Sequence, residues 1–126
     1  MARVVSSFWV GAYLRRCQGA GAFAAVLRHG ADEAGAIFVK IVRGDGTADL
    51  YGPAPQALVD EDRPVDRQFE QVFARAPEAD IDARLERERA FDPDIWVIEV
   101  EDRDGRSFLD MPVADRPGWE GVFHVR

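Results

Sequence analysis

The sequence predicts an α+β domain, with an antiparallel sheet of about five or six strands and two or three helices packed on one face. Two segments carry apolar residues at helical spacing, short runs rich in β-branched and aromatic residues lie between them, and Gly- and Pro-containing turns separate these runs. The chain has 126 residues, a length typical of one domain. We therefore expect a single domain over residues 1–126.

The first helix is predicted at Phe8–Gln18. Ser6 and Ser7 stand where an N-cap residue is expected, and Gly19 and Gly21 end the pattern. Apolar residues recur inside it at helical spacing: Val10, Leu14 and Cys17. This spacing places Cys17 on the inner face of an amphipathic helix, where a buried structural thiol is expected.

The next three segments are predicted to be strands. Two of them, Ala22–Arg28 and Ala36–Val42, are short and apolar. A Gly-Asp-Gly-Thr turn at 44–47 follows, and a symmetric hairpin around it places Ile41 opposite Leu50 and Lys40 opposite Tyr51. Prolines at positions 53 and 55 then end strand pairing, because proline has no N–H to donate.

The segment 67–75 is ambiguous. Its apolar residues follow helical spacing, but Phe69 and Phe73 also share strand parity; the pattern favours a helix and leaves a strand open. A second long helix is predicted at Glu78–Ala90, with Ile81 and Leu85 facing the core.

A hairpin is predicted after this helix. The Asp92-Pro93-Asp94 step ends the helix, and the residues from position 95 alternate between two faces. Asp104-Gly105 is a strong hairpin signal, and a two-residue turn there places Val100 opposite Leu109. The predicted buried residues are Trp96, Ile98, Val100, Ile37, Val39, Ile41 and Leu85. The segment 111–126 is expected to be a final strand, at 122–125, or a mobile tail.

Composition and charge narrow the classes of function. The chain has 23 acidic and 16 basic residues and a net charge of -7, so a nucleic-acid backbone would be repelled. Cys17 is the only cysteine, which excludes an intramolecular disulfide and favours the reducing cytoplasm. No apolar run approaches the roughly 18–20 residues that cross a bilayer. The sequence predicts a cytoplasmic protein that binds neither nucleic acid nor membrane.

The predicted hairpin has an acidic face. Its carboxylates are Asp94, Glu99, Glu101 and Asp110. Glu99 lies opposite Asp110 in the predicted register, an unfavourable pairing of like charges unless arginines or solvent screen it. A calcium-binding loop is not expected, because the remaining acidic positions of such a loop are missing. No metal and no cofactor is predicted.

Few residues suit nucleophilic catalysis. Cys17 and His29 are the only conceivable dyad, and no third group is placed to orient them. The leading hypothesis is a non-catalytic binding or adaptor protein with a protein partner. Its candidate surface is Trp9, Arg15, Arg16, Tyr51 and Gln56. The alternative is a small enzyme that uses Asp94, Glu99 and Glu101 for acid–base or metal-assisted chemistry. The oligomeric state is not predicted.

Four segments together resemble one family of small bacterial proteins, domain of unknown function 1491. They are SSFWVGAYLRRC at Ser6–Cys17, EAGAIFVK at Glu33–Lys40, LYGPAPQ at Leu50–Gln56 and FDPDIWVIEVEDRDGR at Phe91–Arg106. The resemblance spans about Ser6 to Asp110. It implies family membership and no particular activity.

Overall fold

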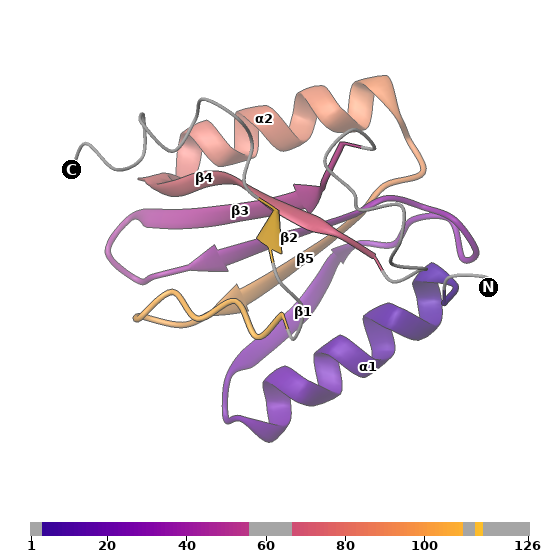
Figure 1. The fold of residues 1–126 in the computed structure, drawn as a ribbon. Helices are drawn as coiled ribbons and strands as arrows, with labels where there is room; N and C mark the ends of the chain where they lie inside the picture. The colour runs from indigo at the N-terminus through magenta and orange to yellow at the C-terminus, as the bar shows by residue number, and fades with distance from the viewer. Residues whose placement is uncertain (1–3, 56–66, 110–112, 115–126) are drawn as a thin grey trace.

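The structure is a computed structural model that describes residues 4–55, 67–109 and 113–114. Its elements, in chain order, are α1 (Ser6–Gly19), β1 (Phe23–Arg28), β2 (Ile37–Val42), β3 (Thr47–Pro53), β4 (Phe69–Pro77), α2 (Glu78–Phe91), β5 (Trp96–Glu101) and β6 (Val113–Ala114). The strands form one sheet in the order β1-β5-β2-β3-β4-β6, and the two helices lie on opposite sides of it (Figure 1). The α+β class is confirmed.

The sheet is mixed but mostly antiparallel, so the prediction of an antiparallel sheet is correct only in part. β2 runs parallel to β5 and β4 runs parallel to β6, while the other neighbours are antiparallel. β5 lies between β1 and β2 and contributes apolar side chains to both faces of the sheet, although its face toward α2 ends in Glu99 and Glu101. Trp96 and Ile98 belong to the core beside α1, and Val97 belongs to the core beside α2. A strand that buries apolar side chains on both faces is stable inside a sheet that is covered on both sides.

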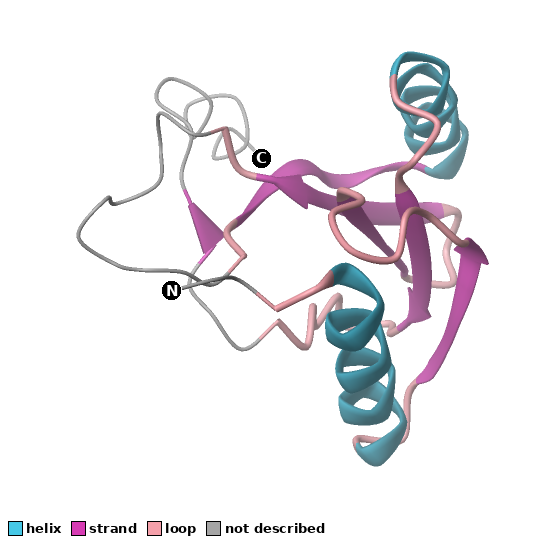
Figure 2. Ribbon diagram, turned by 90° about the vertical axis from the view of Figure 1, so that its right-hand side faces the viewer, coloured by secondary structure: helices cyan, strands magenta, loops and turns pink. Residues whose placement is uncertain are grey.

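The helices cover both faces, which corrects the prediction that they pack on one face (Figure 2). α1 contributes Val10, Tyr13 and Cys17 to one core, and α2 contributes Ile81 and Leu85 to the other. The seven residues predicted to be buried are all buried. The structure therefore confirms which side chains are buried. It places them in two cores, one on each face of the sheet.

The hairpin predicted at Asp104-Gly105 does not form. A turn does occur there, since Gly105 has a φ of 76° and its N–H donates to the Asp102 carbonyl at 3.0 Å. The chain then continues toward α1 instead of returning along β5. β1 pairs with β5 where the second strand of the predicted hairpin was expected, and it places Ala24 opposite Val100. The predicted pairing of Val100 with Leu109 is therefore wrong.

The ambiguous segment is a strand, so the preference for a helix at 67–75 is wrong. β4 pairs with β3 along its length, and Phe69 is buried in the core beside α1. Phe69 and Phe73 shared strand parity in the sequence, but a bulge at Leu50 shifts the register, and Phe73 packs against the core beside α2. The available edge of β3 decides the outcome, because a short segment has little helical stability of its own.

The β2–β3 hairpin forms one residue out of the predicted register, with Ile41 opposite Asp49. The turn is tighter than the symmetric one because the Arg43 N–H donates to the Thr47 carbonyl at 3.0 Å. Gly44 and Gly46 between them have φ values of 86° and 89°, a conformation that glycine adopts without strain.

α1 begins at Ser6, two residues before the predicted start, and has no side-chain N-cap. Carbonyl groups of the loop after β1 take that role: Ser6 N–H donates to Glu33 and Ser7 N–H donates to Asp32. The Ser6 hydroxyl instead donates to the Gly35 carbonyl at 2.7 Å. The second helix, α2, matches its predicted range closely. The strand predicted at 122–125 lies outside the described residues.

Candidate functional site

Trp9, the first residue of the predicted partner surface, packs toward the sheet. Its ring stacks on Tyr13 with 5.0 Å between centroids and contacts Phe69 at 5.3 Å. Trp9 is only partly exposed and borders the core beside α1. This packing gives Trp9 a structural role, whatever else its exposed edge contacts.

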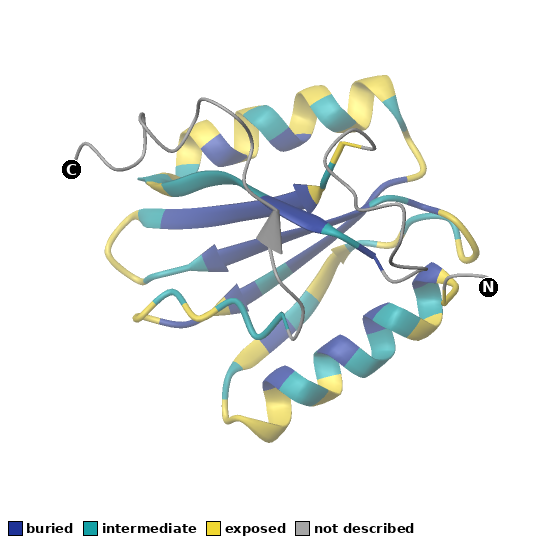
Figure 3. Cartoon of the chain, in the orientation of Figure 1, coloured by how far each residue is buried: buried dark blue, intermediate teal, exposed yellow. Residues whose placement is uncertain are grey.

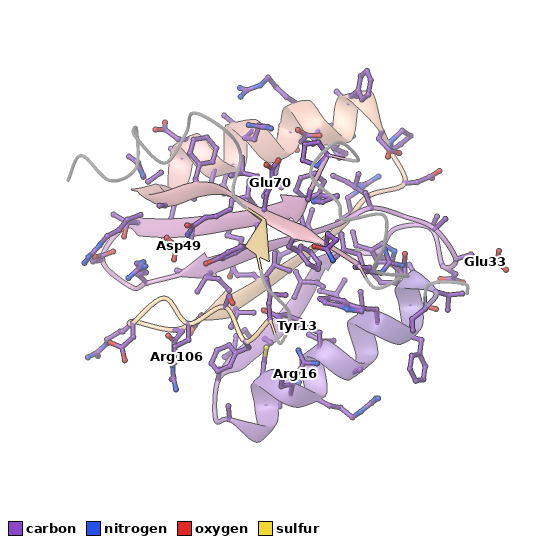
Figure 4. The ribbon with its side chains drawn as sticks, in the orientation of Figure 1. Tyr13, Arg16, Glu33, Asp49, Glu70 and Arg106 are labelled. Carbon is purple, nitrogen blue, oxygen red and sulfur yellow. The ribbon has the colours of Figure 1, made fainter. Side chains whose placement is uncertain are left out.

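The two arginines of the predicted surface differ. Arg15 is exposed, whereas the guanidinium of Arg16 donates to the Phe108 carbonyl at 2.8 Å. The Tyr13 hydroxyl donates to the neighbouring Ser107 carbonyl. Both side chains extend from α1 toward the segment that follows β5 (Figure 4). Arg16 and Tyr13 thus hold the segment after β5 beside α1.

Tyr51 is buried, with 8% of its surface exposed. Burial, with a further contribution from the charge of Asp49, raises the pKa of Tyr51 to about 12. The Gln71 side-chain amide donates to its hydroxyl at 3.2 Å. Tyr51 therefore belongs to the core rather than to an open surface, and Gln56 lies outside the described residues.

The predicted acidic face is not one site. Asp94 and Glu101 lie at opposite ends of β5, roughly 20 Å apart at the usual rise per strand residue. Glu99 and Glu101 share the face toward α2, and Asp110 lies outside the described residues. In the described part of the chain, no group of three or more His, Cys, Asp or Glu side chains is placed to hold a metal ion.

Glu99 forms an ion pair that the predicted hairpin did not include. Lys40 lies directly opposite it on β2, and the two side chains are 3.5 Å apart. The Lys40 ammonium also contacts Asp82 at 2.9 Å and Glu78 at 3.3 Å. Burial opposes the charge, but the hydrogen bonds and charges of these carboxylates raise the pKa of Lys40 above its usual value. Three carboxylates around one ammonium leave an excess of two negative charges.

Cys17 and His29 do not form a dyad. Burial raises the pKa of the Cys17 thiol, which disfavours the reactive thiolate. Ala22, just before β1, donates to the Cys17 carbonyl, whereas His29 follows the other end of the same strand. The six residues of β1 separate them, and His29 instead contacts Asp32 and the Trp96 ring.

β1 is the exposed edge of the sheet. Within the described ranges it pairs only with β5, so its outer edge has no neighbouring strand. Its large apolar side chains are unusually exposed: Phe23 by 59%, Leu27 by 56% and Val26 by 37%. Figure 3 shows the contrast with β2, β3 and β5, which are mostly buried.

A groove lies between β1 and α2. Its volume is about 400 Å³, and it is lined by Leu27, Arg28, Asp82, Leu85, Glu86, Arg89 and Val97. It exists because α2 packs mainly over β3 and β4 and leaves the β1 side of the same face open. Phe23 lies opposite Glu101 on β5, so it points to this face as well. We call the surface formed by Phe23 together with these lining residues the β1 groove.

Sequence reasoning identified β1 as a strand but did not identify its place at the edge. The available signal was weak: Ala22–Arg28 is apolar without alternating, which is equally typical of a buried strand. Among the described residues, no helix is long and apolar enough to cross a membrane.

Comparison with known proteins places the chain among relatives of unknown function. The family model described as "Protein of unknown function (DUF1491)" matches residues 4–110. A DUF1491 family protein from Caulobacter crescentus CB15, solved by crystallography, is 43% identical with a TM-score of 0.74, covering 89% of this chain and 98% of that one. The solution structure of protein Atu0922 from A. tumefaciens is 44% identical with a TM-score of 0.72, covering 89% and 99%.

An NMR structure of a DUF1491 family protein from Caulobacter crescentus CB15 is also similar, with 43% identity and a TM-score of 0.72 over 89% of this chain and 97% of that one. No curated protein matches the chain. The family model covers most of the sequence, and the resemblance drawn from four sequence segments is confirmed. The chain belongs to the DUF1491 family.

Proposed function

We propose that this protein is a binding module that accepts an extended segment of a partner protein as an additional strand beside β1. The observation that carries this proposal is the exposed sheet edge of β1, with apolar side chains next to a groove. An unpaired edge presents alternate backbone N–H and C=O groups that a partner strand can bond. Pockets for alternate side chains then add specificity, and the β1 groove supplies such a pocket.

The protective features of natural edge strands are confined to one end of β1. Such edges are commonly blunted by charged residues, prolines or bulges. β1 has a register shift between Val26 and Arg28 and a charge at Arg28, whereas Phe23–Val26 is regular and uncharged. A partner strand would therefore pair with Phe23–Val26 and place side chains in the part of the β1 groove that Leu27 and Arg28 line.

The apolar surface is large enough to contribute to binding. Phe23 and Leu27 each expose more than half of their surface. Covering the exposed parts would contribute roughly 1–2 kcal/mol for each side chain. Backbone hydrogen bonds along the edge would add to this and fix the direction of the partner.

The first experiment selects displayed random peptides on the purified full-length protein and measures how they bind variants. We expect selected peptides to lose at least tenfold in affinity for Leu27→Asp, because this change puts a carboxylate in the groove. Phe8→Asp is the matched control, since Phe8 is equally exposed, at 63%, but lies on α1. Unfolding midpoints of both variants check that the fold is kept.

The backbone contribution is tested separately on the same peptides. N-methylation of alternate peptide residues should abolish binding at the positions that bond β1 and spare those between them. Peptides that bind Leu27→Asp as tightly as the wild type would overturn the proposal. So would a selection that yields no binding peptide, or binding that no single N-methylation weakens.

A further inference from the structure

We infer that the partner segment is basic, and that an Arg or Lys opposite Ala25 reaches over this small residue to Glu99. This inference rests on the proposed function, because it concerns a segment paired with β1. It adds the chemical class of the partner and the position at which charge is recognised.

The charges beside the β1 groove are divided by position. Glu99 and Glu101 lie opposite Ala25 and Phe23, toward the first part of β1. Asp82 on α2 shares the Lys40 ammonium with Glu99, which places it at the same end. Arg28 lies at the other end of β1, where its guanidinium donates to the Pro93 carbonyl at 2.8 Å. Glu86 and Arg89 also line the groove, and they pair with each other at 2.8 Å, so together they add no net charge.

Negative charge is in excess at the first part of β1. Glu78 is the third carboxylate on Lys40, and the exposed Glu101 has no cation among the contacts found in the described residues. Four carboxylates against one ammonium leave three uncompensated negative charges. A partner with positive side chains there is favoured, and an acidic partner is repelled.

Ala25 opens a path between the partner and Glu99. Neighbouring strands lie about 4.8 Å apart, so a partner residue opposite Ala25 would be about 10 Å from Glu99 across β1. Ala25 lies directly opposite Glu99, and both side chains point to the face of α2. The methyl group of Ala25 leaves space above it, and long Arg and Lys side chains can extend over a small neighbour. Phe23, two residues earlier, blocks the same path to Glu101.

Glu99 is suited to a second cation. Its side chain is 24% exposed, and 3.5 Å is the longest of the three contacts that Lys40 makes with carboxylates. One carboxylate has several acceptor positions, so it can bond a partner cation without releasing Lys40. This partly buried position makes the pairing stronger than one at an exposed rim.

The test uses the peptides that Leu27→Asp rejects. We expect them to be enriched in Arg and Lys, to bind less tightly as salt is raised, and to lose about fivefold to thirtyfold in affinity for Glu99→Gln. Glu88→Gln is the matched control, because the Glu88 side chain is 28% exposed and pairs with Arg84 on α2. Its affinity should stay within twofold of the wild type.

A second variant leaves the Glu99–Lys40 pair in place. Ala25→Leu closes the proposed path, so the peptides should lose their salt dependence and their preference for Arg or Lys at one position. Peptides that need Leu27 but are indifferent to Glu99→Gln and Ala25→Leu would overturn this inference and leave the proposed function standing. A stable dimer that Leu27→Asp dissociates would also overturn it, because a second copy would then occupy the edge.

Discussion

Buried carboxylates fix the backbone around them, between distant segments at Asp49 and within one turn at Asp102. Asp49 is 1% exposed, and its carboxylate accepts bonds from the Arg43 guanidinium and from the backbone N–H of Arg75. Asp102 similarly accepts bonds from the backbone and side chain of Arg106. Both carboxylates accept hydrogen bonds in the folded protein. Replacing either one would leave its donors without an acceptor and lower the free energy of unfolding by about 1–3 kcal/mol.

Tyr51 gives a prediction about pH. Its pKa in the folded protein is about 12, against about 10 for an exposed tyrosine, so the folded state holds the proton more tightly. The stability is unaffected below pH 10 and falls as the pH rises from 10 toward 12. We expect Tyr51→Phe to cost about 1 kcal/mol at pH 7, through loss of the Gln71 hydrogen bond.

Urea unfolding from pH 7 to pH 11.5 checks this prediction. The difference in the free energy of unfolding between wild type and Tyr51→Phe should shrink and then reverse, by roughly 2 kcal/mol in total. Tyr13, whose pKa is also raised by burial, is present in both proteins, so the comparison reports mainly on Tyr51. A difference that stays constant across this range would show that Tyr51 titrates as an exposed residue.

The irregular end of β4 gives a prediction at the scale of one element. Arg75 has a φ of 55°, in the left-handed region that side chains other than glycine disfavour. A register shift between Ala48 and Leu50 in the β3–β4 pairing accompanies it, and the bond from Arg75 N–H to Asp49 at 2.7 Å fixes the conformation. The exposed ion pair of Arg75 with Asp45, at 3.7 Å, adds little.

We expect Arg75→Gly to raise the free energy of unfolding by about 0.5–1 kcal/mol, because glycine adopts this conformation without strain. Ala74→Gly, one residue earlier in the same irregular stretch but without a positive φ, should lower it by a similar amount. Chemical denaturation of the two variants measures both effects. Equal losses in both variants would contradict the idea that strain is located at Arg75.

The described part of the molecule forms a single sheet with a separate core on each face. β2 and β5 are bonded on both sides and buried on both faces, so they connect the two cores. Within the described residues, β1 pairs on one side only, and it carries the exposed apolar side chains Phe23, Val26 and Leu27. This order of exposure makes the centre of the sheet the most stable part and the β1 edge the least stable.

Amide hydrogen exchange tests this order. Amides of β2 and β5 should exchange only through global unfolding, whereas those β1 amides that are not bonded to β5 should exchange within minutes. The measurement is exchange followed by NMR at neutral pH. Uniform protection of β1 at the level of β2 would mean that the outer edge is covered in solution.

The sequence by itself determined much of the local structure. Helical spacing located both helices, apolar runs located β1, β2 and β5, and the turn at 44–47 located β3. The seven residues predicted to be buried are buried. Four sequence segments also indicated the family. These features depend on neighbouring residues in the chain, because apolar periodicity and turn chemistry are local properties.

Only the tertiary structure decided how these elements are arranged. The chain cannot specify locally that β5 lies between β1 and β2, since hydrogen bonds between strands join residues far apart in sequence. This arrangement removed the predicted hairpin, placed Glu99 opposite Lys40 and left Phe23 and Leu27 exposed at the edge. The candidate site therefore arises from the order of the strands, in which β5 lies inside the sheet because its apolar side chains contribute to the cores on both faces.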